Sequence, residues 1–427
     1  MINDQYAVYL PAVQDNFASC VTATVPVGRP FPSGIDLSDL AFWNKNSKLW
    51  THNKALYSIG QHSVGSTVNN GITSKGRTDF LLVGDSGGYQ IGKGSLSGFD
   101  KLVDGMSALE ALDAWACAYE VKDWITGWLE THCDYAMTLD MPLWATLKNN
   151  ENSPFHKCSP EMLMAMTKDN LKFIDKHRQG RTKWLNVIQG LDEQSTITWW
   201  NTVKWFDCSG YAIAGAAGIQ GGIKQLLTTI LMMRDDKAFK AGHDWIHVLG
   251  VSTTRWSILL SAIQRQLQKH VNPKLRVSFD SSSPFRTAGI SQQLTTLPTF
   301  NEHTSSWSFG TQTVPQGQQY IGNTTLLSND SPIGRRITLG DLNVVADEWQ
   351  SNKFDTISNM VVTNHNVYIY LKGFEEANRI AFETDRNKVP TSWRECIELI
   401  ERVFDSKNWR AELENGKPVL DAVAPPA

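Results

Sequence analysis

The chain alternates short apolar runs with longer segments of helical periodicity, and this alternation is the feature that most restricts its fold. Six short runs are mostly apolar, as strands buried on both faces are. They are 80–85, 135–140, 184–190, 211–215, 246–251 and 277–280. Apolar residues three or four positions apart mark helices in the intervening segments 107–132, 159–178 and 253–270. The alternation predicts parallel β/α units, either in a (β/α)8 barrel or in an open doubly wound sheet.

The last third of the chain departs from this alternation. Residues 292–331 are rich in Thr, Ser, Asn, Gln and Gly, a composition typical of loops or irregular β structure. Helical periodicity returns at 375–384 and 392–404. We therefore expect a catalytic α/β domain over 1–290, including strands near the N-terminus. A small α+β extension over 291–427 would follow it, completing the barrel or contacting the substrate.

Charge and hydropathy restrict how the protein could bind a nucleic acid or a membrane. The chain has 40 Lys and Arg against 43 Asp and Glu, a formal net charge of −3, so a nucleic acid would have to meet a local basic patch. The first residues do not form a cationic segment followed by an apolar one, and no apolar run is long enough to span a membrane. The six cysteines lack short CxxC spacing. These features predict a cytoplasmic protein with reduced cysteines and no membrane partner.

Acidic and amide side chains lie at the ends of several predicted strands. Asp85, Asp140 and Asp280 each end one run, and Gln189 lies near the end of another. Both candidate folds place their chemistry at the carboxyl ends of the strands. Two facing carboxylates, such as Asp85 and Asp280, suit double displacement at a sugar carbon, while Asp140 and Gln189 could read the edge of a purine. The alternative for each acid alone is a helix cap or a turn.

Two further patterns bear on this site. In the segment DSGGYQ, Gly87 and Gly88 would let a planar ligand approach the backbone, and Tyr89 could supply a stacking face. His243 and His247 are four residues apart, but they straddle the start of a predicted strand rather than sharing a helix face. We therefore do not expect them to bind a metal.

Six motifs occur in the order seen in tRNA-guanine transglycosylases. They are DSGGYQ (85–90), TLDMP (138–142), VIQG (187–190), GYAIAG (210–215), VLGV (248–251) and DSSSPFR (280–286). The match covers about residues 80–290, half of the chain. The chain thus resembles this family, whose members are (β/α)8 barrels that exchange guanine for a 7-deazaguanine in a polynucleotide.

The resemblance implies a role for each matching residue. Asp280 resembles the nucleophile that attacks C1′ of the sugar, and Asp85 resembles the general acid and base. The implied contacts to the base come from Ser86, Tyr89, Asp140, Gln189, the backbone amide of Gly215, and Leu249. Tyr89 and Leu249 would cover the two faces of the base, and Arg286 would lie near the backbone phosphates. No metal and no other cofactor is implied.

The chain also departs from the tRNA enzymes. Those enzymes carry a zinc site built from CxCxxC and a later His, whereas this chain has no cysteine between Cys208 and Cys396. Asp140 is followed by Met141 where the tRNA enzymes often have two acids, and Ala214 replaces the first of two glycines. These departures resemble the divergent 7-deazaguanine DNA transglycosylases of bacterial modification clusters and bacteriophages.

The resemblance therefore predicts replacement of guanine in DNA by a 7-deazaguanine such as preQ0, through a covalent Asp-deoxyribosyl intermediate. The expected partners are DNA, the free 7-deazaguanine base and accessory modification proteins, in the cytoplasm of a bacterial or phage-infected cell. Two alternatives stay open. The polynucleotide could be tRNA, or the barrel could be an N-glycoside hydrolase in which water accepts the sugar.

Overall fold

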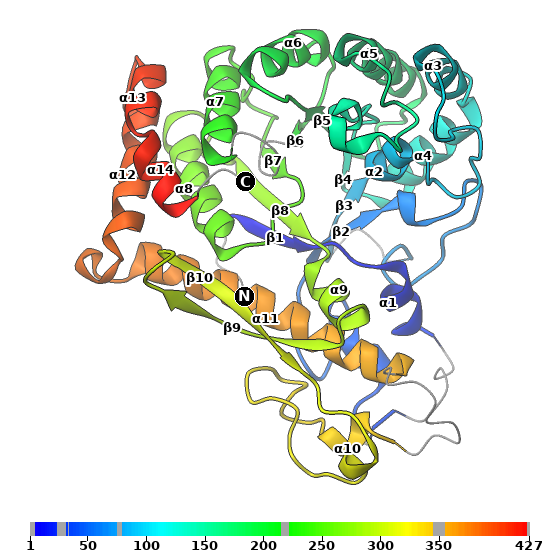
Figure 1. Cartoon of the computed structure of the whole chain (residues 1–427), viewed down its shortest axis with the longest axis vertical. Coiled ribbons are helices and arrows are strands. Elements are labelled where there is room, and N and C mark those ends of the chain that lie inside the picture. Colours follow the sequence, from blue (N-terminus) through cyan, green and yellow to red (C-terminus); the bar gives the residue numbers. More distant parts are fainter. Residues whose placement is uncertain are drawn as a thin grey trace.

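Eight parallel strands form the centre of the molecule (Figure 1). The computed structural model describes residues 5–23, 31–32, 34–74, 79–214, 222–344 and 355–424. The strands are β1 (Val8–Pro11), β2 (Lys54–Ser58), β3 (Leu81–Asp85), β4 (Tyr135–Met137), β5 (Lys183–Ile188), β6 (Gly210–Ile213), β7 (Trp245–Val248) and β8 (Arg276–Ser281). Their order is β1-β8-β7-β6-β5-β4-β3-β2. At the two ends of this order, Ala12 forms a parallel bridge with Leu56, and the Val13 amide donates to the Leu56 carbonyl at 2.9 Å. The sheet is thus nearly closed, and the predicted (β/α)8 barrel is confirmed.

Helices surround the strands as the alternation predicts. They are α1 (Asp15–Cys20), α2 (Gly88–Lys93), α3 (Ala108–Ala116), α4 (Tyr119–His132), α5 (Pro160–His177), α6 (Glu193–Val203), α7 (Gly222–Asp235), α8 (Thr254–His270) and α9 (Ser283–Gly289). The single helix predicted over 107–132 is in fact two. It begins as expected, with Ser107 and Glu110 in a capping box. It breaks at Ala118, where Lys122 donates to the Ala116 carbonyl that the break leaves free.

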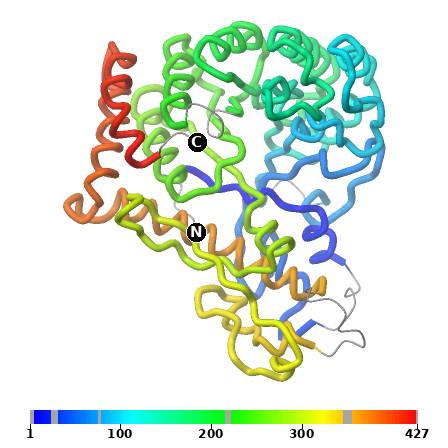
Figure 2. The backbone as a smooth tube through the Cα atoms, in the orientation of Figure 1, coloured from blue at the N-terminus to red at the C-terminus, as the bar shows by residue number. Residues whose placement is uncertain are grey.

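The C-terminal extension packs against the barrel mainly through its longest helix, and its last helices also contact α7 and α8. Its elements are β9 (Gln293–Asn301), β10 (Ser306–Thr313), α10 (Leu339–Leu342), α11 (Thr356–Glu383), α12 (Thr391–Asp405), α13 (Trp409–Asn415) and α14 (Lys417–Val423). The antiparallel hairpin β9–β10 runs beside α11 along one side of the barrel (Figures 1 and 2). Phe374 of α11 contacts Tyr9 of β1 and Phe279 of β8, with ring centroids 4.8 and 5.1 Å apart. The extension therefore shares one apolar core with the outer layer of the barrel.

Short turns of 3-10 helix connect several of these elements. They are η1 (Leu37–Leu40), η2 (Ile59–Gln61), η3 (Leu143–Thr146), η4 (Lys148–Asn150), η5 (Gln318–Tyr320) and η6 (Arg386–Lys388). Two of them, η2 after β2 and η3 after β4, lie at the carboxyl ends of strands. Among the helices of the described residues, none is both long enough and apolar enough to cross a membrane.

The inside of the barrel is filled at one end and open at the other. Tyr135 at the start of β4 packs on Trp245 at the start of β7, with ring centroids 4.7 Å apart. Leu10, Val83 and Leu185 are among the buried side chains of this inner cluster. Because parallel strands all start at the same end, these large rings close the amino-terminal end, and a ligand can enter from the carboxyl end.

Candidate active site

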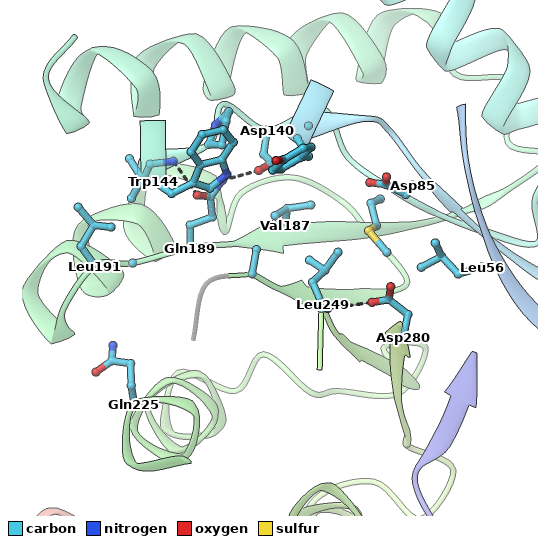
Figure 3. Close-up of a pocket in the computed structure, with 18 residues that line it drawn as sticks. Leu56, Asp85, Asp140, Trp144, Val187, Gln189, Leu191, Gln225, Leu249 and Asp280 are labelled. Carbon is cyan, nitrogen blue, oxygen red and sulfur yellow. Dashed lines mark hydrogen bonds between the residues drawn. The ribbon is translucent and has the colours of Figure 1, made fainter. Parts of the chain in front are cut away.

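A cavity of about 390 Å³ opens at the carboxyl ends of the strands (Figure 3). Its size lies within the range of about 300–1,000 Å³ common for small-molecule sites. The predicted site residues that line it are Asp85, Tyr89, Asp140, Gln189, Leu249 and Asp280. Asp85 and Asp280 lie toward one end of the cavity, and Leu191 and Gln225 toward the other (Figure 3). The barrel thus brings together side chains that are up to 195 positions apart, from 85 to 280.

Asp280, near the end of β8, is held by one of its two oxygens. Its Oδ1 accepts from the Gly250 amide at 2.9 Å and lies 3.2 Å from Nε2 of His247. Among the described residues, none forms a hydrogen bond with the other oxygen, Oδ2. A carboxylate fixed through one oxygen, with the second available in a cavity, has the geometry that a nucleophile needs.

Asp85, the last residue of β3, has a raised pKa. Burial in the cavity wall is the main cause, and the negative charge of Asp280 adds to it. A hydrogen bond with the Ser58 hydroxyl opposes the shift. Because a carboxyl with a raised pKa keeps its proton closer to neutral pH, Asp85 is suited to donate that proton to a leaving group.

Asp140, three residues after β4, is paired with Gln189, which follows β5. The Gln189 amide nitrogen donates to Oδ2 of Asp140 and, at 3.2 Å, to the Met141 carbonyl. Its oxygen accepts from the Leu143 amide at 2.8 Å. Burial first, and then repulsion by Asp85, raise the pKa of Asp140 to about 7, against the opposing bond from Gln189. Gln189 therefore orients Asp140. Both of its N–H donors are in use, so it could donate to a base only by exchanging one of them, whereas its oxygen can accept a second bond.

Aromatic side chains form one rim of the cavity. Tyr89 is 62% exposed and its ring lies 5.6 Å from that of Trp144, at an angle of 35°. Lys93 places its ammonium group 5.2 Å from the centre of the Trp144 ring. Trp144 was not among the predicted site residues. Its position two residues after the TLDMP motif was the available signal, because loops that follow barrel strands carry site residues.

The two glycines of DSGGYQ serve different purposes. Gly87 has a φ of +82°, and a Cβ there would lie 2.9 Å from Cα of Gly60 in η2. It is therefore required for close backbone packing rather than for a ligand. Gly88 lines the cavity, and a Cβ there would lie 3.4 Å from Oδ1 of Asp140. A side chain at Gly88 would therefore contact Asp140, and the expected approach of a planar ligand to this backbone stays a prediction.

Two other predicted residues lie elsewhere, and the position of a third is not described. Ser86 is buried and donates to the Thr138 carbonyl at 3.2 Å, so it joins β3 to the end of β4 and does not line the cavity. Arg286 is exposed on α9 and lines a separate hollow beside α1 and α11. Gly215 lies outside the described residues, although its neighbour Ala214 lines the cavity.

The described residues contain no group of three or more His, Cys, Asp or Glu side chains that could hold a metal ion.

Comparison with protein-family models and with curated protein sequences finds no match for this chain. Support for a function therefore comes from the motifs and from the geometry of this cavity.

Proposed function

We propose that this protein is a base-exchange transglycosylase that replaces guanine in DNA with a 7-deazaguanine. The observation that carries the proposal is the pair of carboxyl groups in one cavity. Asp280 is fixed through Oδ1 with Oδ2 available, and Asp85 has a raised pKa. This combination of a nucleophile and a proton carrier is the one that retaining exchange at a sugar carbon requires.

The reaction has two displacement steps. In the first, Oδ2 of Asp280 forms a bond to C1′ of the deoxyribose, the bond from C1′ to guanine breaks, and guanine leaves with the proton of Asp85. In the second, Asp85 takes the proton from N9 of the incoming base, N9 bonds to C1′, and the electron pair of the C1′–Oδ2 bond returns to Asp280. Two inversions give overall retention of configuration.

The rest of the cavity suits a purine-like base. Leu249 and Val187 give it apolar walls, and Tyr89 and Trp144 give it an aromatic rim. Asp140 offers carboxylate oxygens, the acceptors that the N–H groups on the guanine edge need. A nucleotide reaches such a cavity only when it leaves the stack, which costs a few kcal/mol in a duplex and less in a single strand.

Two features favour DNA over tRNA. The chain lacks cysteines between Cys208 and Cys396, so the zinc subdomain with which the tRNA enzymes grip tRNA cannot be built in its usual form. The departures at Met141 and Ala214 also resemble the DNA branch of the family.

The test is incorporation of radiolabelled guanine and preQ0 into single-stranded DNA, duplex DNA and bulk tRNA. Asp280→Asn keeps the shape of the nucleophile and removes its reactivity, and Asp100→Asn alters an exposed carboxylate as a matched control. We expect incorporation into DNA that Asp280→Asn abolishes and Asp100→Asn leaves intact. Incorporation into tRNA alone would overturn the choice of DNA. Release of guanine without incorporation would identify an N-glycoside hydrolase, and no reaction with any polymer would overturn the proposal.

A further inference from the structure

A chain of hydrogen bonds runs from the closed end of the barrel to Asp280. The Trp245 indole Nε1 lies 2.8 Å from Oγ of Ser278, which lies 2.9 Å from Nδ1 of His247. Nε2 of His247 lies 3.2 Å from Oδ1 of Asp280. Strand geometry explains the arrangement, because side chains two apart on a strand share a face and His247 of β7 is in register with Ser278 of β8. Both His247 and Ser278 are completely buried.

The chemistry of the two end members fixes the direction of this chain, because an indole N–H only donates and a carboxylate oxygen only accepts. An indole N–H can only donate, so Trp245 uses Ser278 as an acceptor. The single hydroxyl proton of Ser278 has two acceptors in reach, Nδ1 of His247 at 2.9 Å and the Ile246 carbonyl at 3.5 Å. The shorter contact is within normal hydrogen-bond distance and the longer one is not. Ser278 therefore donates to Nδ1, which leaves the proton of a neutral imidazole on Nε2, facing Asp280.

We propose that His247 is a positioning residue that acts through Asp280, held in its Nε2–H tautomer by Trp245 and Ser278. The proposal rests on the proposed function for its kinetic consequences. Nε2–H of His247 and the Gly250 amide each donate to Oδ1 of Asp280. These two bonds fix the carboxylate so that Oδ2 points toward C1′. These donors interact best with the full carboxylate, so they stabilise Asp280 as it leaves the sugar in the second displacement.

Loss of the His247 donor should therefore slow the second step more than the first. When the covalent ester breaks, negative charge develops on Asp280 and is shared with Oδ1. A bond to a charged group contributes about tenfold or more in rate when it is made only as the charge develops. We expect decay of the covalent intermediate to become about tenfold slower, so that the intermediate accumulates.

Two variants of equal length separate the donor from the shape of the side chain. His247→Gln keeps an N–H donor within reach of Asp280, and His247→Met does not. Quenched reactions with guanine-containing DNA would measure formation of the adduct, and addition of preQ0 would measure its decay. In His247→Met we expect the covalent adduct to decay slowly and to accumulate. In His247→Gln the ratio of the decay rate to the formation rate should stay close to that of the unmodified protein. Equal behaviour of both variants, or a proportional loss of both rates, would overturn the positioning role.

A spectroscopic measurement tests the tautomer without any reaction. Nitrogen NMR of the ¹⁵N-labelled histidine rings in the full chain should show His247 with Nδ1 unprotonated and Nε2 protonated, and Ser278→Ala should change that pattern. A protonated Nδ1 in the unmodified protein would overturn the proposal. If the expected tautomer is present but the unmodified protein forms no adduct with DNA or tRNA, the proposed function fails and the hydrogen-bond assignment stands.

Discussion

Replacing Asp140 with Asn should stabilise the protein at neutral and alkaline pH. Burial, together with the charge of Asp85, raises the pKa of Asp140 from its ordinary 3.8 to about 7. Above that pH the folded protein holds an anion in a site that disfavours it. Asn has the same shape and can still accept the hydrogen bond from the Gln189 amide, but it carries no charge.

The direction and size of the effect follow from proton linkage. Between pH 3.8 and about 7 the folded state binds more protons at Asp140 than the unfolded state does, so the free energy of unfolding falls as pH rises through this window. The difference between these two pKa values corresponds to ~4 kcal/mol at about 1.36 kcal/mol per pH unit. Water in the open cavity screens the charge, so we take that figure as an upper bound and expect about 1–3 kcal/mol.

The assay is urea unfolding of the unmodified protein, Asp140→Asn and the exposed control Asp100→Asn at pH 5, 6, 7 and 8. The advantage of Asp140→Asn in free energy of unfolding should grow with pH and level off above pH 7, while Asp100→Asn should show no such trend. An advantage that does not change with pH, or a loss of stability at pH 8, would refute the reasoning. Binding of free guanine should weaken about tenfold or more in the same variant, because a carboxylate acceptor is lost.

Three further changes test other parts of the site. Asp85→Asn should lower the initial rate of base exchange about 10²–10⁴-fold while free preQ0 still binds, and a rate above a tenth of normal would contradict its role as proton carrier. Gly87→Ala should lower the thermal midpoint more than Gly65→Ala, because both have positive φ but only Gly87 also meets a neighbouring backbone; equal losses would argue against close packing on Gly60. Trp144→Leu should weaken preQ0 binding by several-fold in calorimetry, whereas Trp205→Leu, an exposed change with the same chemistry, should leave it unchanged.

The sequence predicts the parts of this fold that depend on local patterns. Each of the six apolar runs overlaps a strand, β3 to β8, because strands buried on both faces need continuous apolar residues. The strands β1 and β2 were expected near the N-terminus but not located, since VYLP has only four residues and ends in Pro, and KALYS mixes polar with apolar residues. Their strand structure depends on pairing with β8 and β3, which no local pattern shows.

Helix α11 shows why local periodicity fails in other places. The sequence predicts helix only at 375–384, yet α11 begins at Thr356. The part of α11 that was not predicted contains Asn364 and His365. Such polar residues are usually found in loops or at the surface, but both are buried here. Asn364 donates to the Leu40 carbonyl at 2.8 Å, and the ring of His365 lies 2.7 Å from the Ser331 hydroxyl. Tertiary hydrogen bonds thus make these polar residues compatible with the core, and such partners are visible only in the fold.

The sequence predicted which acidic residues line the cavity, but not how their surroundings make them differ. Motif order identified Asp85, Asp140 and Asp280, but three identical carboxyl groups can differ only through their surroundings. Asp280 accepts two N–H donors on one oxygen, whereas burial raises the pKa of Asp85 and Asp140. Repulsion between Asp85 and Asp140 also means that ionisation of either one opposes ionisation of the other. The surroundings therefore differentiate identical side chains for the proposed exchange, because burial favours the protonated form of Asp85 while N–H donors fix one oxygen of Asp280.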